Sequence, residues 1–597
     1  MVVVPCLVST DIITNTLLVE GSKISDHYEV AEITVKLAVN RIPYARILLV
    51  DGDAATGTFA ISETEDFIPG KSVEIRVGYD SEEATIFRGV VVKHGIRVKD
   101  EGKSYLVVTC MDKAAILTIG RKCTLYLQQK DSDVISTLLG DAGLQADVTA
   151  TEQQYPELVR YYATDWDFIV ARAEANGLIV LVEAGRVSVK PPDVSSAPVL
   201  EIRYGAALQT IQAEIDARTQ LPSVKCSSWD FSSQSLVSGE SSEPSVNEQG
   251  NLSGEDLAQT FGLTAFGLAT AAPEPQSVLS SWASAQLLKS RLARIRGMVS
   301  FEGNAEARPG ALIELAGLGA RFNGQAFVSA VHHRIEPGSW TTEAELGLSP
   351  RWFVEEHPDL QAPSASALLP GIHGLHLAKV KQIDADPDGQ TRVQVEVPLL
   401  ESTGGDGIWA RIATGYATKD AGIFFMPEVG DEVVLGFINN DPRFPLILGS
   451  LYSSQQSPPY TPDADNTKKA IVTKGQIKII LDDEKKDLRI ETPGGHSVTL
   501  RDDQASITIL DSSGNKISMT SSAVTVESVA DLVLKAATNV RIEAGTALSA
   551  KAGTDLTLEG LNVIATANVG FKAQGQAQAE LSASGQTTVK GGVVMIN

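Results

Sequence analysis

The chain has 597 residues, and because a single hydrophobic core stops growing near roughly 250–300 residues, several domains are expected. A formal net charge of −24 argues against nucleic acid as a partner. The four cysteines, Cys6, Cys110, Cys123 and Cys226, lack metal-ligand spacing and suit folding in a reducing cytosol. No run of about eighteen apolar residues could span a bilayer as a helix, and Met1–Pro5 lacks the basic region of a secretory signal.

Residues 1 to about 231 alternate β-type runs with short helices. Strand-like runs lie at 73–79, 85–94 and 105–109. A capped amphipathic helix is expected over 131–139, stopped at Gly140 or Gly143. A second helix is expected from Trp166 to about Asn176, with Thr164 or Asp165 as its cap and Gly177 at its end.

The middle of the chain contains two polar breaks. Residues 232–275 are rich in Ser, Glu, Gly, Asn and Pro without a sustained period, which predicts a linker or a mobile surface loop. A helix is expected over 276–296, and strands follow to about Trp352. The second break, near 355–369, also contains proline.

A compact β unit follows at about 371–452. Five short strand-like runs, separated by Gly and Asp-Pro turns, predict a small Greek-key barrel of the OB type. The runs lie at 377–383, 392–397, 409–412, 432–438 and 446–451. A polar neck then leads to a rod that begins near Ile477.

The last seventy or so residues repeat with a period of eight, apart from one seven-residue step between Leu556 and Val563. Each octad holds two apolar residues spaced by one, so both point to the same face of a strand. One octad offers too few apolar residues to enclose a core, whereas three chains around a common axis would close the section and leave no open edge. A disordered low-complexity tail is the alternative. The expected trimer core consists of Val524, Val526, Leu532, Leu534, Val540, Ile542, Leu548, Leu556, Leu558, Phe571, Leu581 and Val589.

The barrel residues are specific enough to indicate a family. Ala378-Lys379-Val380, the turn 386–389, Trp409-Ala410-Arg411 and the run 426–433 occur in the order and spacing of the barrel of VgrG proteins and of contractile-tail spikes, which this sequence resembles. By this resemblance, nine residues are assigned to the barrel scaffold rather than to catalysis. They are Trp409, Pro427, Gly430, Asp431, Glu432, Gly436, Phe437, Pro442 and Gly449.

The first 355 residues resemble the hub of the same proteins less sharply. The motifs are Phe87-Arg88-Gly89, Asp165-Trp166-Asp167-Phe168 and the strand 328–333. The resemblance implies a mainly β, multi-domain fold with minor α: a β-barrel-containing hub, an OB-type barrel and a C-terminal trimeric triple-stranded β-helix. It implies a pseudo-sixfold hub of three chains on which a sixfold tail tube sits. The expected parts are the hub at 1–231 and 276–368, the linker or loop at 232–275, the barrel at 369–455, the neck at 456–476 and the rod at 477–597.

An enzyme is not expected. Only about 25 residues separate Tyr452 from Ile477, too few for the lysozyme domain that some phage spikes insert between barrel and rod. His373 and His376 have no neighbouring Cys or carboxylate cluster, and His332 and His333 point to opposite faces of a strand. No Ser-His-Asp or Cys-His pattern stands out, although such sites need not be visible in sequence. No catalytic residue, metal or cofactor is predicted.

The end of the rod is uncharged and mostly apolar, which would leave strand edges and apolar side chains in water. No histidine follows His496, so a histidine–metal tip is not expected. A capping partner would cover both features, and in the family this partner is a small PAAR-type protein; a frayed terminus is the alternative. The predicted docking residues are Gly591, Gly592, Val593, Val594, Met595, Ile596 and Asn597.

The sequence therefore predicts a non-enzymatic, homotrimeric spike that is assembled in the bacterial cytoplasm and punctures a target envelope from a contractile particle. Its expected partners are two further copies, the tail tube and baseplate at the hub, and a PAAR-like tip protein. The alternatives are a type VI secretion VgrG that delivers effectors, a phage baseplate spike with cryptic cell-wall hydrolase activity, and a carbohydrate-binding tailspike. No Trp or Tyr follows Tyr460, which argues against sugar binding by the rod.

Overall fold

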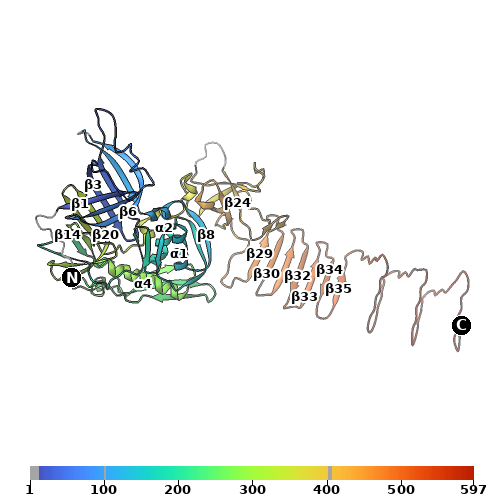
Figure 1. Ribbon diagram of the computed structural model, residues 1–597. Helices are drawn as coiled ribbons and strands as arrows, with labels where there is room; N and C mark the ends of the chain where they lie inside the picture. The colour runs from blue at the N-terminus through green and yellow to red at the C-terminus, as the bar shows by residue number, and fades with distance from the viewer. Residues whose placement is uncertain (1–11, 100–101, 401–406, 597) are drawn as a thin grey trace. The chain divides into compact units, whose positions relative to one another are not determined.

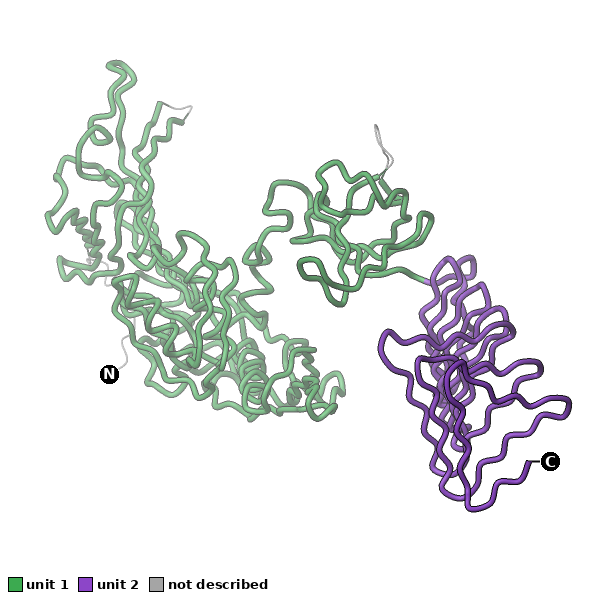
Figure 2. The backbone as a smooth tube through the Cα atoms, turned by 90° about the vertical axis from the view of Figure 1, so that its right-hand side faces the viewer, with its two compact units in different colours: residues 1–451 green, residues 452–597 purple. Residues whose placement is uncertain are grey.

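The computed structural model describes residues 12–99, 102–400 and 407–596. The chain divides into two compact units, Met1–Leu451 and Tyr452–Asn597 (Figure 2). The described residues are mainly β with few helices (Figure 1), which confirms the predicted fold class. No helix in the described ranges is long and apolar enough to cross a bilayer.

A thirteen-stranded sheet forms the centre of the hub. Eleven of its strands follow the path β14-β18-β21-β20-β3-β4-β7-β6-β5-β1-β2, and β19 pairs with β20 and with β13. Alternating side chains on β5 point into the core, as in Val73, Ile75 and Val77. The pairing of β20 with β3 joins the two halves of the hub sequence. The strands are β1 Ile13–Val19, β2 Ser22–Lys23, β3 Val30–Ala38, β4 Tyr44–Val50, β5 Ser72–Tyr79, β6 Glu82–Val98, β7 Ser104–Met111, β13 Leu200–Arg203, β14 Leu208–Ile215, β18 Ile295–Glu302, β19 Leu312–Ala316, β20 Gly324–Glu336 and β21 Ser339–Leu346.

A second core of the hub forms around two helices, α1 (Asp131–Asp141) and α2 (Asp165–Ala175), close to their predicted positions. The Thr164 hydroxyl accepts the Asp167 N–H at 3.0 Å and caps α2. The other elements here are η1 Lys113–Thr118, β8 Lys122–Lys130, β9 Gln145–Val148, β10 Gln154–Ala163, β11 Ile179–Glu183 and β12 Arg186–Lys190. Helix α4 (Gln276–Leu292) ends four residues before the expected 296, because Ile295 already begins β18.

The expectation of a linker or mobile loop over 232–275 is wrong. The segment contains β16 (Ser235–Glu240), α3 (Gly254–Ala258), η3 (Gln259–Phe261) and β17 (Phe266–Thr270). Strands β16 and β17 flank β15 (Val224–Asp230), and η2 (Ala217–Thr219) precedes this sheet.

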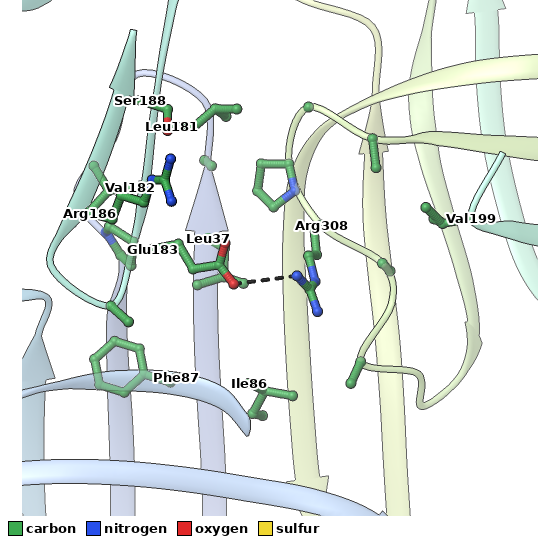
Figure 3. Close-up of a pocket in the computed structure, with 18 of the residues that line it drawn as sticks. Leu37, Ile86, Phe87, Leu181, Val182, Glu183, Arg186, Ser188, Val199 and Arg308 are labelled. Atoms are coloured by element: carbon green, nitrogen blue, oxygen red, sulfur yellow. Dashed lines mark hydrogen bonds and ion pairs between the residues drawn. The ribbon is translucent and has the colours of Figure 1, made fainter. Parts of the chain in front are cut away.

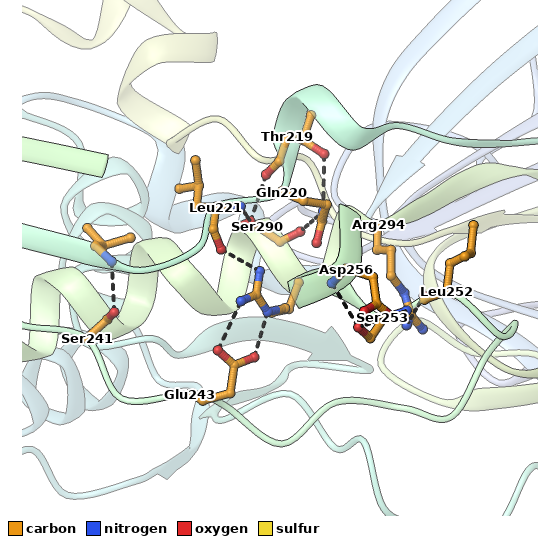
Figure 4. Close-up of polar contacts among 12 residues, drawn as sticks. Thr219, Gln220, Leu221, Ser241, Glu243, Leu252, Ser253, Asp256, Ser290 and Arg294 are labelled. Atoms are coloured by element: carbon orange, nitrogen blue, oxygen red, sulfur yellow. Dashed lines mark hydrogen bonds and ion pairs between the residues drawn. The ribbon is translucent and has the colours of Figure 1, made fainter. Parts of the chain in front are cut away.

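Side chains of α4 and of the short link that follows it explain why a segment of such polar composition is ordered. The guanidinium of Arg291 donates to Glu243 at 2.6 and 3.0 Å and to the Leu221 carbonyl at 2.8 Å, and Arg294 donates to the Leu252 carbonyl at 2.8 Å (Figure 4). Gly239 lies so close to α4 that a Cβ there would be 2.4 Å from the Ser280 nitrogen. Because these contacts come from residues later in the chain, they produce no periodic pattern within 232–275 itself.

The second polar break becomes a connector between hub and barrel. It contains three short helical turns, α5 (Phe353–Glu356), η4 (Pro358–Leu360) and η5 (Ser364–Ala367). Phe353 is buried in the core around α1 and α2, so the first turn belongs to the hub.

Five strands close the predicted barrel in the order β22-β23-β24-β28-β27. Its strands are β22 His376–Gln382, β23 Val393–Glu396, β24 Ile408–Ile412, β27 Glu432–Phe437 and β28 Pro445–Ser450. A small hairpin, β25 (Ala417–Thr418) and β26 (Ala421–Gly422), and the turn η6 (Ile438–Asn440) lie between strands. The barrel core is aliphatic, with Val393, Val395 and Leu435 fully buried.

The second unit begins with a seven-stranded antiparallel meander (Figure 1). Its first strand lies inside the predicted neck, so the neck boundary at 476 is wrong; two lysines at its start gave it a polar appearance. The strands are β29 Lys468–Val472, β30 Lys478–Asp482, β31 Asp487–Glu491, β32 Ser497–Arg501, β33 Ser506–Leu510, β34 Lys516–Met519 and β35 Val524–Glu527. From 528 to 596 the single chain forms no hydrogen-bonded strand.

Candidate functional site

Two apolar rows cross one face of the meander. In each row, every residue is the direct cross-strand partner of the next, so the rows run across the sheet without a register shift. The first row is Ile471, Ile479, Ile490, Val498, Ile509, Ile517 and Val526, and the second is Leu481, Leu488, Leu500, Ile507, Met519 and Val524. The first octad pair, Val524 and Val526, is therefore the last member of both rows.

Part of the first row, from Ile490 to Val526, lines an open groove of about 530 Å³ that reaches Leu532. A single-layer sheet with one apolar face in water is not stable alone, since strands need a hydrophobic face packed against another layer. The opposite face carries polar residues such as Thr499, Thr508 and Thr525. The groove therefore identifies the face that a partner must cover.

The predicted trimer-core residues of the octads are all exposed in one chain. Their exposed fractions run from 53% at Val526 to 78% at Leu581. The backbone of 528–596 has no strand partner within the chain, so its N–H and C=O groups also lack strand hydrogen bonds. Apolar side chains and unpaired backbone thus occur together over the same residues.

The predicted docking residues at the end of the rod are exposed as well. Val593, Met595 and Ile596 are almost fully accessible, and Val594 is about half-exposed. Gly591 and Gly592 are exposed, and Asn597 lies outside the described residues.

The predicted scaffold residues lie along three barrel strands and the loops between them. Gly430 has φ +98° in the turn before β27, and the Asp431 carboxylate accepts the Glu428 N–H at 2.9 Å there. Phe437 packs on the barrel core and meets the His376 ring edge-on at 5.6 Å. Trp409 is half-buried on β24. The other members lie in the loop before β27 (Pro427), in β27 (Glu432 and Gly436), after η6 (Pro442) and in β28 (Gly449).

One cavity of the hub, about 770 Å³, has a wall of mixed charge (Figure 3). Arg308 faces Glu183 at 3.4 Å and Arg186 faces Asp147 at 3.1 Å, so these cations already have partners. Burial raises the pKa of Asp112, which accepts two backbone N–H groups. These charges hold the cavity wall together and do not converge on a common reacting point.

One serine–histidine pair has the geometry of a nucleophile and its base, and no local motif indicates it because the residues are 32 positions apart. Ser62 Oγ lies 2.7 Å from Nε2 of His94, whose Nδ1 lies 2.9 Å from the Phe67 carbonyl. The backbone N–H groups of Ile61 and Ser62, however, donate to Asp51. A carboxylate therefore occupies the donors that an oxyanion would need, and the pair fastens a loop.

Neither pair of neighbouring histidines brings its ring nitrogens together around a common point. His376 Nε2 contacts the His373 carbonyl oxygen at 3.0 Å, not its ring. Desolvation lowers the pKa of the buried His333 to about 3, whereas His332 lies 3.5 Å from Glu345. Within the described ranges, no three His, Cys, Asp or Glu side chains gather to hold a metal ion.

Two family models match this chain. The model described as the Alg8 N-terminal domain covers residues 9–337, more than half of the chain. The model described as the type VI secretion system/phage-baseplate injector OB domain covers residues 376–452 and coincides with the closed barrel.

Curated relatives and solved structures carry related names. The type VI secretion system spike protein VgrG1b of Pseudomonas aeruginosa is 22% identical over 391 residues, which are 59% of this chain and 50% of the relative. The actin cross-linking toxin VgrG1 of Vibrio cholerae is 29% identical over 143 residues, 23% of this chain and 12% of the toxin. A tail protein from Neisseria meningitidis aligns with 57% of this chain and 98% of its own, at 14% identity and a TM-score of 0.43.

The chain thus spans about half the length of the first of these relatives and a small part of the second. The resemblance first seen in the barrel motifs is confirmed by the barrel model and by relatives that bear the VgrG name. The chain belongs to the Alg8 N-terminal domain family, and its injector OB domain and its relatives support its similarity to VgrG spike proteins.

Proposed function

We propose that this protein is the non-enzymatic, homotrimeric spike of a contractile injection system. The observation that carries the proposal is the pair of apolar rows, which ends in the first octad pair and has no covering layer in the single chain. Three copies would bury the rows and octads on a common axis and pair the free backbone between chains. The names of the relatives support this assignment.

The proposed mechanism is mechanical. The hub receives the tail tube and baseplate, the OB barrel joins hub to rod, and the rod concentrates the force of sheath contraction on the target envelope. Strands hydrogen-bonded between three chains resist local unfolding, since opening one strand disturbs two others. The apolar residues 593–596 would be covered by a conical PAAR-like tip protein.

The absence of catalysis is part of the proposal. The match to the actin cross-linking toxin covers 12% of that protein, so its printed activity is not transferred to this chain. The Ser62–His94 pair lacks free oxyanion donors, which supports the same view. A free contractile particle and a type VI machine fit these features equally, and sheath and tube genes beside membrane-complex genes would identify the latter.

Two measurements on the purified full chain test the proposal. Sedimentation equilibrium at micromolar concentration should give three times the monomer mass of 63.4 kDa. Incubation with peptidoglycan should release no muropeptides. A stable monomer would refute the spike, and muropeptide release lost in the S62A variant would refute the non-enzymatic assignment.

A further inference from the structure

The connector between hub and barrel is fastened to the hub at its first half. The Arg121 guanidinium donates to the carbonyls of Asp359, Leu360 and Gln361 at 2.7, 3.1 and 3.1 Å. The Phe353 N–H donates to the buried Glu174 carboxylate at 2.7 Å, and the Phe353 ring is buried in the hub core. These contacts fix the connector up to residue 361.

The second half of the connector is fastened to the barrel. Asn439 Nδ2 donates to Ser366 Oγ at 3.2 Å, and the Ile372 N–H donates to the Asn440 carbonyl at 2.8 Å. Ala365 is fully buried, and Ser364 lies against Gly371, where a Cβ would be 2.4 Å from the serine Cβ. Only residues 362–363 lie between the two fastened halves.

The barrel-side half begins with a strained turn. Ala365, Ser366 and Ala367 have φ values of 49°, 54° and 60°, so three consecutive residues with a Cβ adopt the left-handed conformation. This region is disfavoured for such residues because Cβ approaches the following carbonyl oxygen. Backbone strain of this kind persists only where surrounding contacts enforce it, and here these contacts come from the barrel.

We propose that the turn 364–367 is a force-sensitive coupling between hub and barrel. Load on the connector breaks the few hydrogen bonds to Asn439 and Asn440, and the turn then relaxes to extended backbone. Four residues that lengthen from about 2.0 to about 3.3 Å each add roughly 5 Å of reach. The hub clamp at Arg121 and the barrel strands stay intact, because neither includes the turn. The role under load rests on the proposed spike function.

The test is hydrogen exchange of the peptide covering 364–372 in the full-length protein. Ala367 is exposed, so a substitution there removes no buried side-chain contact. A367G should slow exchange roughly fivefold or more, because glycine accepts the left-handed conformation. A367P, which requires φ near −65° and lacks the backbone N–H, should speed exchange to the rate of an open loop.

A matched control is A184G, which changes a left-handed alanine (φ 50°) in the turn between β11 and β12. It should leave exchange at 364–372 unchanged. If A367G and A367P leave the connector rate unchanged, or if A184G alters it equally, the coupling is refuted. The measurement needs no injection machine, so a failure of the coupling is distinguishable from a failure of the spike assignment.

Discussion

At the scale of single residues, the apolar octad positions carry the proposed trimer. Leu534→Asp would place three carboxylates on the proposed axis, where burial without partners is costly. We expect loss of SDS-resistant trimers on unheated gels. Thr538→Asp, which lies between apolar pairs, serves as the matched control and should leave the trimer intact. Equal trimer yields for both variants would contradict the octad assignment.

His333 should make the hub sensitive to acid. Desolvation lowers its folded-state pKa to about 3, whereas an unfolded histidine titrates near 6.5. Between these values the unfolded state binds the extra proton, so this contribution to stability is complete above about pH 6.5 and is lost as pH falls, by up to about 1.4 kcal/mol per pH unit. Denaturant unfolding of wild type and H333Q across pH 4–7 checks this, and identical slopes would exclude His333 as a cause.

Arg291 should contribute more to the unfolding free energy of the hub than an exposed arginine does. Its side chain is 2% exposed and donates to the 44% exposed Glu243 and to the Leu221 carbonyl, so R291M removes the donor from both acceptors. We expect R291M to lower the unfolding free energy of the hub by about 2 kcal/mol. R218M removes an 80% exposed partner of Asp216 and should leave the unfolding free energy almost unchanged. Thermal unfolding of the two variants gives the comparison.

At the scale of elements, we expect the exposed end of the rod to bind the tip protein without being needed for the trimer. Deleting Val593–Asn597 should abolish co-purification with a co-expressed PAAR-like protein, because the apolar surface of residues 593–596 is removed. The trimer should remain, since the apolar rows and the octads before this end are untouched. Retained co-purification would place the tip contact elsewhere on the chain.

Elements with a local pattern could be predicted from sequence, whereas those held by distant side chains could not. The barrel strands and α2 follow from apolar alternation and from the Thr164 cap. The order of 232–275 depends on Arg291 and Arg294, at the end of a helix that lies later in the chain and just after it. The left-handed conformation of 365–367 was equally invisible, because alanine and serine do not favour positive φ.

At the scale of the whole molecule, we expect trimer assembly and folding of the second unit to be one process. If the second unit folds only as a trimer, its unfolding temperature must rise with protein concentration, because dissociation accompanies unfolding. Calorimetry of residues 452–597 and of the full chain over a hundredfold concentration range measures this. A concentration-independent transition would mean that a single chain covers its own apolar rows.

The unbroken apolar rows have a consequence for biosynthesis. A ribosome completes the meander, which pairs within one chain, before it completes the octads, which lack partners in that chain. Three nascent chains on neighbouring ribosomes can therefore align their meanders first, and the octads then pair in phase as they emerge. Adding or removing one residue in a meander turn would send every later side chain to the wrong face. In the proposed trimer, the meander would thus set the phase of the octads that follow it, up to the seven-residue step after Leu556.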